Sequence, residues 1–192
     1  MCCRYYIYRS GAELIRELLD PAERDVTLRE GEVRPSEETD VLLLERGRLC
    51  ARRMRWGFLS PRGSDLLINA RAETAAQKPS FSDSLMRRRC VIAASLFYEW
   101  DPEHQKVGFS APDQPLLFMA GLYRDFADGR RFTVLTVPAG ADVAPVHDRM
   151  PLLLPKRETT AWLSDETAVP ALLKTASPAL RIHRAYEQLS LF

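Results

Sequence analysis

The sequence lacks a long apolar run. The longest such stretch in its 192 residues, CVIAASLFY at 90–98, is far shorter than the roughly 20 residues that an apolar helix needs to cross a bilayer. The first residues also lack the apolar core of a secretory signal, because Arg4 and Arg9 interrupt what hydrophobicity there is. We therefore expect no membrane span, and we expect a cytoplasmic protein.

Paired metal-ligand spacings are missing as well. Cys2, Cys3, Cys50 and Cys90 form no C-x-x-C pair, and the chain has 3 histidines. In a reducing compartment such cysteines are expected to be free thiols. We therefore expect no metal and no cofactor, and a structural zinc protein is the least favoured interpretation.

The chain has almost no excess of charge, with a net charge of +1. The net charge alone therefore does not indicate a nucleic-acid partner. Acidic residues crowd 13–45, whereas basic clusters occur as RRMR at 52–55 and RRR at 87–89. One charge cluster is usually a solvated face, but two clusters, one of them ending beside Trp56, favour a groove that binds phosphates and stacks bases.

Length and composition, 46% hydrophobic and 28% charged, are those of one globular domain. A capping-box pattern at 10–13 precedes an apolar helix pattern that Pro21 ends, and further helices are expected at 82–88 and 158–163. Patterns typical of strands occur at 41–45, 48–58, 66–70, 90–94, 96–100, 115–123, 131–137 and 151–154.

The domain is expected to cover residues 1–175, followed by a tail at 176–192. Within the domain, the acidic stretch at 30–40 is the one segment expected to be a flexible loop.

Three short segments carry polar groups that suit chemistry. In INARAET, alternation places Asn69, Arg71 and Glu73 on one face of an extended segment, although a solvent-exposed strand face explains this segment alone equally well. In FYEW, Glu99 lies between large aromatic residues, which would desolvate its carboxyl and raise its pKa as a general acid or base requires, with a buried, hydrogen-bonded structural glutamate as the alternative. In VHDRMP, His147 is followed by Asp148 and Arg149 in a loop before an apolar strand, although a lone loop histidine is usually only a surface residue.

Six blocks occur in a fixed order: MC-x-R at the start, MRWG, NARAET, RRCVIAASLFYEW, TVPAGA and VHDRMP. Together they resemble the SRAP family, the SOS-response-associated peptidases, over residues 1–155. The resemblance implies an α/β fold of the α+β type: a single compact domain around a curved, barrel-like, mainly antiparallel β-sheet with a few peripheral helices. It also implies a cytoplasmic protein that binds single-stranded DNA at abasic sites, and so lies with the nucleoid, and that releases its own Met1. We expect a monomer.

The resemblance also gives chemical meaning to the opening MCCRYY. Once Met1 is removed, Cys2 carries an α-amine and a thiol on neighbouring carbons, and these two groups together close a thiazolidine on the aldehyde of an abasic sugar. The catalytic roles that the family implies fall on Cys2, Asn69, Glu99 and His147. The DNA-binding roles that it implies fall on Arg4, Trp56, Arg71, Trp100, Thr136 and Arg149, with core packing an equal alternative for Trp100.

The chain departs from the family pattern at three positions. Cys3 and Leu96 stand where the family usually has Gly, and Ala93 stands where it usually has Pro. Because Leu does not favour positive φ, the turn that enters FYEW must take another conformation.

The final QLSLF resembles the short peptide by which bacterial repair proteins dock on the sliding clamp. Gln188 would be its polar anchor, and Leu189, Leu191 and Phe192 would fill a hydrophobic groove. A small hydrophobic cap on the domain is the alternative. Two other functions stay open for the whole chain: an N-terminal-nucleophile amidohydrolase that uses Cys2, and a noncatalytic single-strand binding module.

Overall fold

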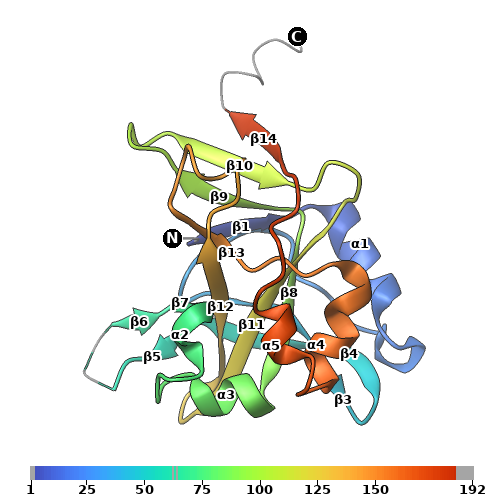
Figure 1. Ribbon diagram of the computed structural model, residues 1–192. Helices are drawn as coiled ribbons and strands as arrows, with labels where there is room; N and C mark the ends of the chain where they lie inside the picture. The colour runs from blue at the N-terminus through green and yellow to red at the C-terminus, as the bar shows by residue number, and fades with distance from the viewer. Residues whose placement is uncertain (1–2, 62, 64, 185–192) are drawn as a thin grey trace.

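The computed structural model describes residues 3–61, 63 and 65–184 (Figure 1). Its strands are β1 (Arg4–Ile7), β2 (Gly31–Val33), β3 (Glu38–Glu45), β4 (Arg48–Trp56), β5 (Phe58–Leu59), β6 (Leu66–Leu67), β7 (Asn69–Arg71), β8 (Arg89–Ala94), β9 (Leu96–Trp100), β10 (Lys106–Ser110), β11 (Leu117–Phe126), β12 (Gly129–Pro138), β13 (Arg149–Pro151) and β14 (Arg181–Arg184). Its helices are α1 (Arg9–Leu18), α2 (Ala72–Ala75), α3 (Ser82–Arg87), α4 (Thr159–Ser164) and α5 (Val169–Leu172), with 3-10 turns at Pro21–Glu23 and Lys156–Glu158.

Five strands close into a barrel in the order β11-β8-β3-β4-β12, and β12 pairs again with β11. The neighbours are antiparallel except for β4 and β12, which run parallel. Closure removes free strand edges from the ring and encloses the apolar side chains of each strand. The fold class expected from the sequence, an α+β domain on a barrel-like and mainly antiparallel sheet, is confirmed.

A second sheet lies across one end of the barrel, with the strand order β14-β10-β9-β1-β2, all antiparallel (Figure 1). Burial alternates along β1, where Tyr5 and Ile7 are buried and Arg4 and Tyr6 are half-buried. One face of this sheet therefore packs on the barrel and the other faces solvent.

The core between barrel and second sheet is aromatic. Trp56 is fully buried, stacks on Phe132 with ring centroids 5.9 Å apart, and contacts Tyr5 at 5.3 Å. Its Nε1 donates a hydrogen bond of 2.9 Å to the Ile68 carbonyl, so its one polar atom is satisfied inside the core. No helix in the described part of the chain is long and apolar enough to cross a membrane.

Two expectations about the chain's organisation are wrong. Helix α1 begins at Arg9, one residue before Ser10, and Ser10 does not cap it; the Tyr8 amide instead donates to Ser95 Oγ at 3.0 Å. The acidic stretch at 30–40 is not a loop, because β2 and the start of β3 occupy most of it. Strand β14, which lies in the segment expected to be a tail, pairs with β10.

The departure at Leu96 has a simple outcome. Leu96 is the first residue of β9, pairs with Tyr6 of β1, and is not among the described residues with positive φ. The chain therefore enters the FYEW block directly as an extended strand, which any residue can adopt.

Gly121 of β11 provides a test of the barrel packing. A Cβ at this position would lie 2.5 Å from Ile92 Cδ1, 2.9 Å from Cys90 Sγ and 3.1 Å from the Thr133 carbonyl oxygen. Overpacking of this kind costs about 1–3 kcal/mol, which exceeds the roughly 0.4–1 kcal/mol that Gly→Ala gains through the unfolded chain. We expect Gly121→Ala to lower the free energy of unfolding in urea, and unchanged or higher stability would contradict this packing.

Candidate active site between the two sheets

The second half of β12 brings three segments of the sequence together. On one side β12 pairs in parallel with β7, which sets Val134 beside Asn69 and Thr136 beside Arg71. On its other side β12 pairs with β13, which sets Pro138 beside Arg149. The NARAET and VHDRMP blocks, far apart in the sequence, therefore flank one strand.

Arg149 is the centre of this arrangement. It is 9% exposed, its Nη1 and Nη2 form a bidentate ion pair with Glu73 at 2.5 and 2.9 Å, and Nη2 donates to the Thr136 carbonyl at 2.7 Å. Hydrogen bonds from Arg149 hold the pKa of Glu73 below its usual range, although partial burial opposes this. The pair ties α2, β12 and β13 together.

This geometry corrects two sequence expectations and adds one residue to the candidate site. Strand β7 ends at Arg71 and helix α2 begins at Ala72, so Glu73 does not continue a strand face with Asn69 and Arg71. Thr136 is fully buried, so its hydroxyl is not at the surface where DNA would contact it. Arg149 forms an ion pair with Glu73, to which the sequence alone assigned no role. The position of Glu73 in the NARAET block was the signal that could have identified it.

Glu99 lies on β9, in the junction between the two sheets. It is 1% exposed, and burial raises the pKa of its carboxyl to about 7. Strand β9 pairs with β1 so that Arg4 faces Tyr98, which sets Cys3 beside Glu99. Burial, and then the charge of Glu99, raise the pKa of the Cys3 thiol. The negative charge of Asp148 contributes to the raised pKa of Glu99, which places the start of β13 near β9.

His147 lies in the loop before β13 and is half-buried. Burial lowers the pKa of its ring, so the imidazole is neutral at pH 7. The Arg149 amide donates to Nδ1 at 2.9 Å, which places the ring proton on Nε2. Asp148 Oδ1 also lies 2.9 Å from Nδ1, but its side chain is 83% exposed, and a nitrogen that accepts from an amide has no proton to donate to it.

Arg4 and Trp100 lie on the solvent face of the second sheet. The Arg4 guanidinium is 5.0 Å from the centroid of the Trp100 ring, and its Nη1 is 3.6 Å from Glu32. Trp100 is half-buried, so of the two roles left open for it the structure permits contact with a ligand. Arg71 is exposed at the end of β7.

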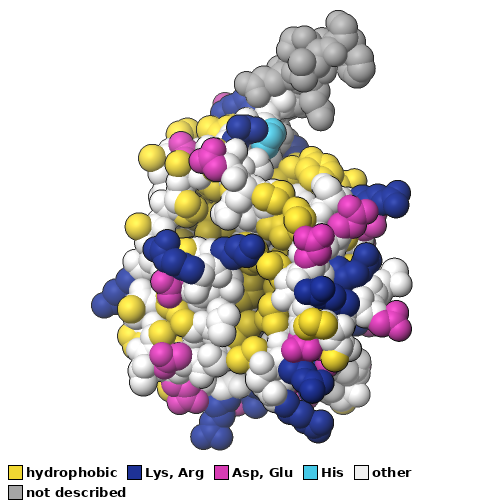
Figure 2. Space-filling view, turned by 90° about the vertical axis from the view of Figure 1, so that its right-hand side faces the viewer, with side chains coloured by type: hydrophobic (Ala, Val, Ile, Leu, Met, Phe, Trp, Pro, Cys, Tyr) yellow, Lys and Arg dark blue, Asp and Glu magenta, His cyan; other side chains and the backbone are white. Residues whose placement is uncertain are grey.

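Trp56 and the basic clusters do not form the expected groove. Trp56 is in the core and is not exposed to a base. The acidic stretch and the first basic cluster neutralise each other across the β3–β4 hairpin, where Arg55 pairs with Glu38 and Arg53 with Asp40. In the second cluster, Arg88 pairs with Asp83, and Arg89 is buried against the carbonyls of Leu85 and Trp162. Figure 2 likewise shows both signs of charge interspersed on the face that it displays.

Two groups of predicted residues lie outside the described part of the chain. One is Cys2, and the other is the clamp-binding peptide of Gln188, Leu189, Leu191 and Phe192. Their roles stay predictions.

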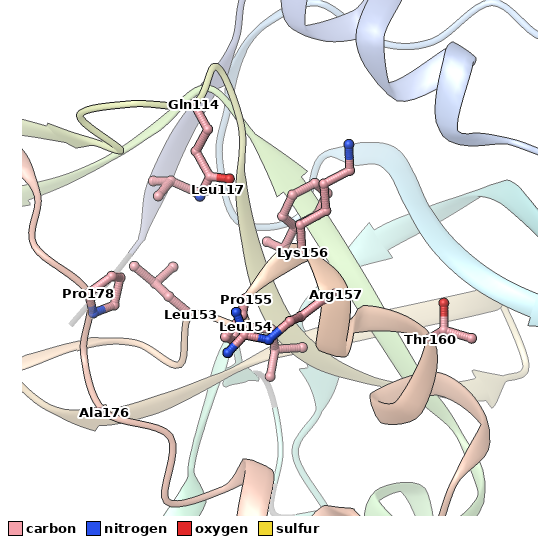
Figure 3. A pocket seen from close by; sticks show the side chains of 11 residues that line it. Gln114, Leu117, Leu153, Leu154, Pro155, Lys156, Arg157, Thr160, Ala176 and Pro178 are labelled. Atoms are coloured by element: carbon pink, nitrogen blue, oxygen red, sulfur yellow. The ribbon is translucent and has the colours of Figure 1, made fainter.

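A pocket of about 740 Å³ lies away from this site (Figure 3). Leu117, Leu153 and Leu154 contribute to its lining, with Lys156 and Arg157 as its charged side chains. No residue predicted for the site lines it, and it offers neither a carboxyl nor a thiol. The candidate site is therefore the junction between the sheets rather than this pocket.

Solved structures share this arrangement of barrel and second sheet. A protein from Bordetella bronchiseptica matches with a TM-score of 0.80 at 23% identity, over 96% of this chain and 99% of that one. A phage-related protein from the same organism matches with a TM-score of 0.78 at 21% identity, over 96% of this chain and 94% of that one. At this identity the likeness establishes the fold.

The chain belongs to the SOS response associated peptidase (SRAP) family, which matches residues 1–189. It is 31% identical over 183 residues to the abasic site processing protein YedK of Escherichia coli (strain K12), covering 86% of this chain and 81% of that protein. It is 29% identical over 195 residues to the abasic site processing protein YoqW of Bacillus subtilis (strain 168), covering 91% and 85%. The resemblance identified from the ordered motifs is confirmed.

The raised pKa of Glu99 has a measurable consequence for stability. An exposed Glu has a pKa near roughly 4.3. Because the folded pKa is about 7, the unfolded chain loses the proton first as the pH rises, so folding stability falls between these two values. We expect Glu99→Gln to remove this fall. The variant should be more stable than the wild type at pH 8, by up to about 3 kcal/mol, and should show little difference at pH 4.

Denaturant unfolding of both proteins at pH 4, 6 and 8 measures this. A stability difference that does not change with pH would show that folding leaves the pKa of Glu99 unshifted, and a wild type that gains stability relative to Glu99→Gln as the pH rises would show that folding lowers it; either result contradicts the prediction.

Proposed function

We propose that this protein binds abasic sites in single-stranded DNA and joins covalently to them through Cys2 after Met1 has been removed. Its relatives are named abasic site processing proteins. The observation that carries the proposal is Glu99, a buried carboxyl with a pKa of about 7 beside the third residue of the chain. Such a group exchanges protons readily at neutral pH.

The chemistry is a condensation in two steps. The α-amine of Cys2 attacks the open-chain aldehyde of the abasic sugar, and loss of one water gives an imine. The Cys2 thiolate then adds to the imine carbon, and the nitrogen takes up a proton to complete the thiazolidine ring. An α-amine pKa of about 7.7–8.0 leaves a neutral fraction for the first step. Only a cysteine at the amino terminus has both groups in place for ring closure.

Glu99 and His147 divide the proton transfers between them. Glu99, half-ionised near pH 7, takes the proton from the attacking amine and returns it to the departing water. His147, neutral and with its proton on Nε2, assists opening of the sugar ring. Asn69 would hold the amine, and the same carboxyl would serve in self-release of Met1.

Arg71, Arg4 and Trp100 would hold the DNA strand. Arg71 and Arg4 contact phosphates beside the lesion, and Trp100 stacks on a neighbouring base. Arg149, for which the family resemblance implies a DNA contact, would in addition support the loop that carries His147 through its ion pair with Glu73.

The two other functions predict different results for one experiment. An amidohydrolase would release an amine from a small amide and would not join DNA. A noncatalytic single-strand binder would bind DNA without a bond that survives denaturation.

The proposed function predicts a covalent adduct. Protein beginning at Cys2, mixed with a single-stranded oligonucleotide that carries one abasic site, should give a complex that survives denaturing gel electrophoresis. We expect Cys2→Ala to form no thiazolidine, and Glu99→Gln to form it about 10²- to 10⁴-fold more slowly. Equal adduct from Cys2→Ala would rule out the thiazolidine.

The proposed function also makes a prediction about noncovalent binding of single-stranded DNA. Arg71→Ala should weaken binding of single-stranded DNA irrespective of sequence and should reduce the salt slope by about 1. Arg87→Ala is the matched control, since Arg87 is also an exposed arginine, at the end of α3, with a side chain 76% exposed. Fluorescence anisotropy at several salt concentrations measures both; equal losses in the two variants would mean that Arg71 makes no specific contact.

A further inference from the structure

The solvent face of the second sheet extends well beyond Arg4 and Trp100, the two of its residues that the proposed function uses. Because side chains alternate along a strand, the pairing registers place one set of residues on this face. Its aromatic members are Tyr6, Tyr98 and Trp100, and its charged members are Arg4, Glu32, Arg34 at the end of β2, Lys106 and Arg181. We call this set the outer platform; Figure 1 shows its strands as one layer across the end of the barrel.

Tyr98 is the centre of the outer platform. It pairs with Gly108 of β10, and a Cβ on that glycine would lie 3.3 Å from Tyr98 Cε1, so the tyrosine ring lies over a position without a side chain. Lys106 Nζ is 3.7 Å from the centroid of the same ring. The ring thus lies against the Gly108 position, and the Lys106 ammonium, which also pairs with Glu32, lies over it as a cation–π partner.

Charge on the outer platform differs from that of the whole chain. Four cations lie on it, Arg4, Arg34, Lys106 and Arg181, against the single carboxylate of Glu32, which leaves an excess of three positive charges in a chain of net charge +1. Glu32 is ionised, because hydrogen bonds from Lys106 and Arg34 hold its pKa below the usual range although burial opposes them. It holds Arg4, Arg34 and Lys106 together in the absence of a ligand.

The surface continues past Tyr6 to the edge of the sheet. Tyr8 is 50% exposed and its ring is 4.9 Å from that of Tyr6. Tyr8, Ser110 and Arg181 line a hollow of about 440 Å³ there. Along the strands, the distance from Trp100 to the Leu96–Tyr6 pair is about 13 Å, and across the strands the distance from β1 to β14 is about 14 Å. This area has room for several bases.

We infer that the outer platform binds the single strand that flanks the lesion, with bases stacked on Tyr98 and Tyr6 and phosphates on Lys106 and Arg181. This rests on the proposed function. Flat aromatic rings interleaved with cations are the combination that binds single-stranded nucleic acid without reading its sequence. The incoming phosphates replace Glu32 as the partners of Lys106, whose movement opens the face of Tyr98 to a base. The strand leaves the reactive end of β1 beside Trp100 and crosses the sheet toward β14.

The test uses oligonucleotides that carry a tetrahydrofuran abasic analogue, which has no aldehyde and so reports noncovalent binding alone. One oligonucleotide has two nucleotides on each side of the analogue and the other has ten. We expect Tyr98→Leu to weaken binding of the long one by about 10-fold, and Lys106→Gln by about 3- to 10-fold with a salt slope smaller by about 1. Both should bind the short one as the wild type does.

The barrel offers a matched control pair. Tyr123 is also a half-buried tyrosine with a cation over its ring, the Arg130 guanidinium at 5.7 Å, but it lies at the β11–β12 hairpin end, away from β13. Tyr123→Leu and Arg130→Gln should leave both affinities unchanged. Glu32→Gln gives a change that misfolding cannot imitate, because loss of the one carboxylate should strengthen binding of the long oligonucleotide.

The inference is overturned if Tyr98→Leu and Lys106→Gln bind the long oligonucleotide as the wild type does, or if they lose equal affinity for both lengths. Failure of the proposed function is a separate result. It would appear as no denaturation-resistant adduct between the wild type and an aldehyde-bearing oligonucleotide, whatever the platform variants do with the analogue.

Discussion

Strand β12 is the constraint on which both the barrel and the site depend. Its first half pairs with β11 and β4 and closes the ring, and its second half pairs with β7 and β13. Because one strand of ten residues carries both sets of hydrogen bonds, the site segments cannot shift without breaking the ladder that closes the barrel. The rigid ring thereby positions Asn69, Arg71 and Arg149.

Two carboxyls near the site show how environment assigns different roles to one residue type. Glu73 is fixed as an anion by the bidentate Arg149 and serves as a support. Glu99, buried where the sheets meet, keeps a proton to about pH 7 and is suited to proton transfer. Because their surroundings shift the two pKa values in opposite directions, Glu73 is suited to a structural role and Glu99 to a chemical one, although both lie near the same site.

The FYEW strand separates chemistry from binding by its period of two. Glu99 points into the junction, whereas Tyr98 and Trp100 point to the solvent face. The same strand therefore presents a buried carboxyl to the inside and aromatic side chains to the outside. A strand of nucleic acid on the outer face would bring its lesion around the end of β1 without burying its phosphates beside Glu99.

The sequence by itself determined the family, the fold class and the raised pKa of Glu99. Ordered motifs, strand periodicity and aromatic neighbours are local properties, and a sequence displays them directly. Tertiary structure alone decided which charges remain available. RRMR looked like a phosphate groove, yet Arg53 and Arg55 meet Asp40 and Glu38 across a hairpin, and Arg149 meets Glu73 from 76 residues away. Local pattern records that a charge exists, but only the pairing register and the closure of the barrel bring its partner to it.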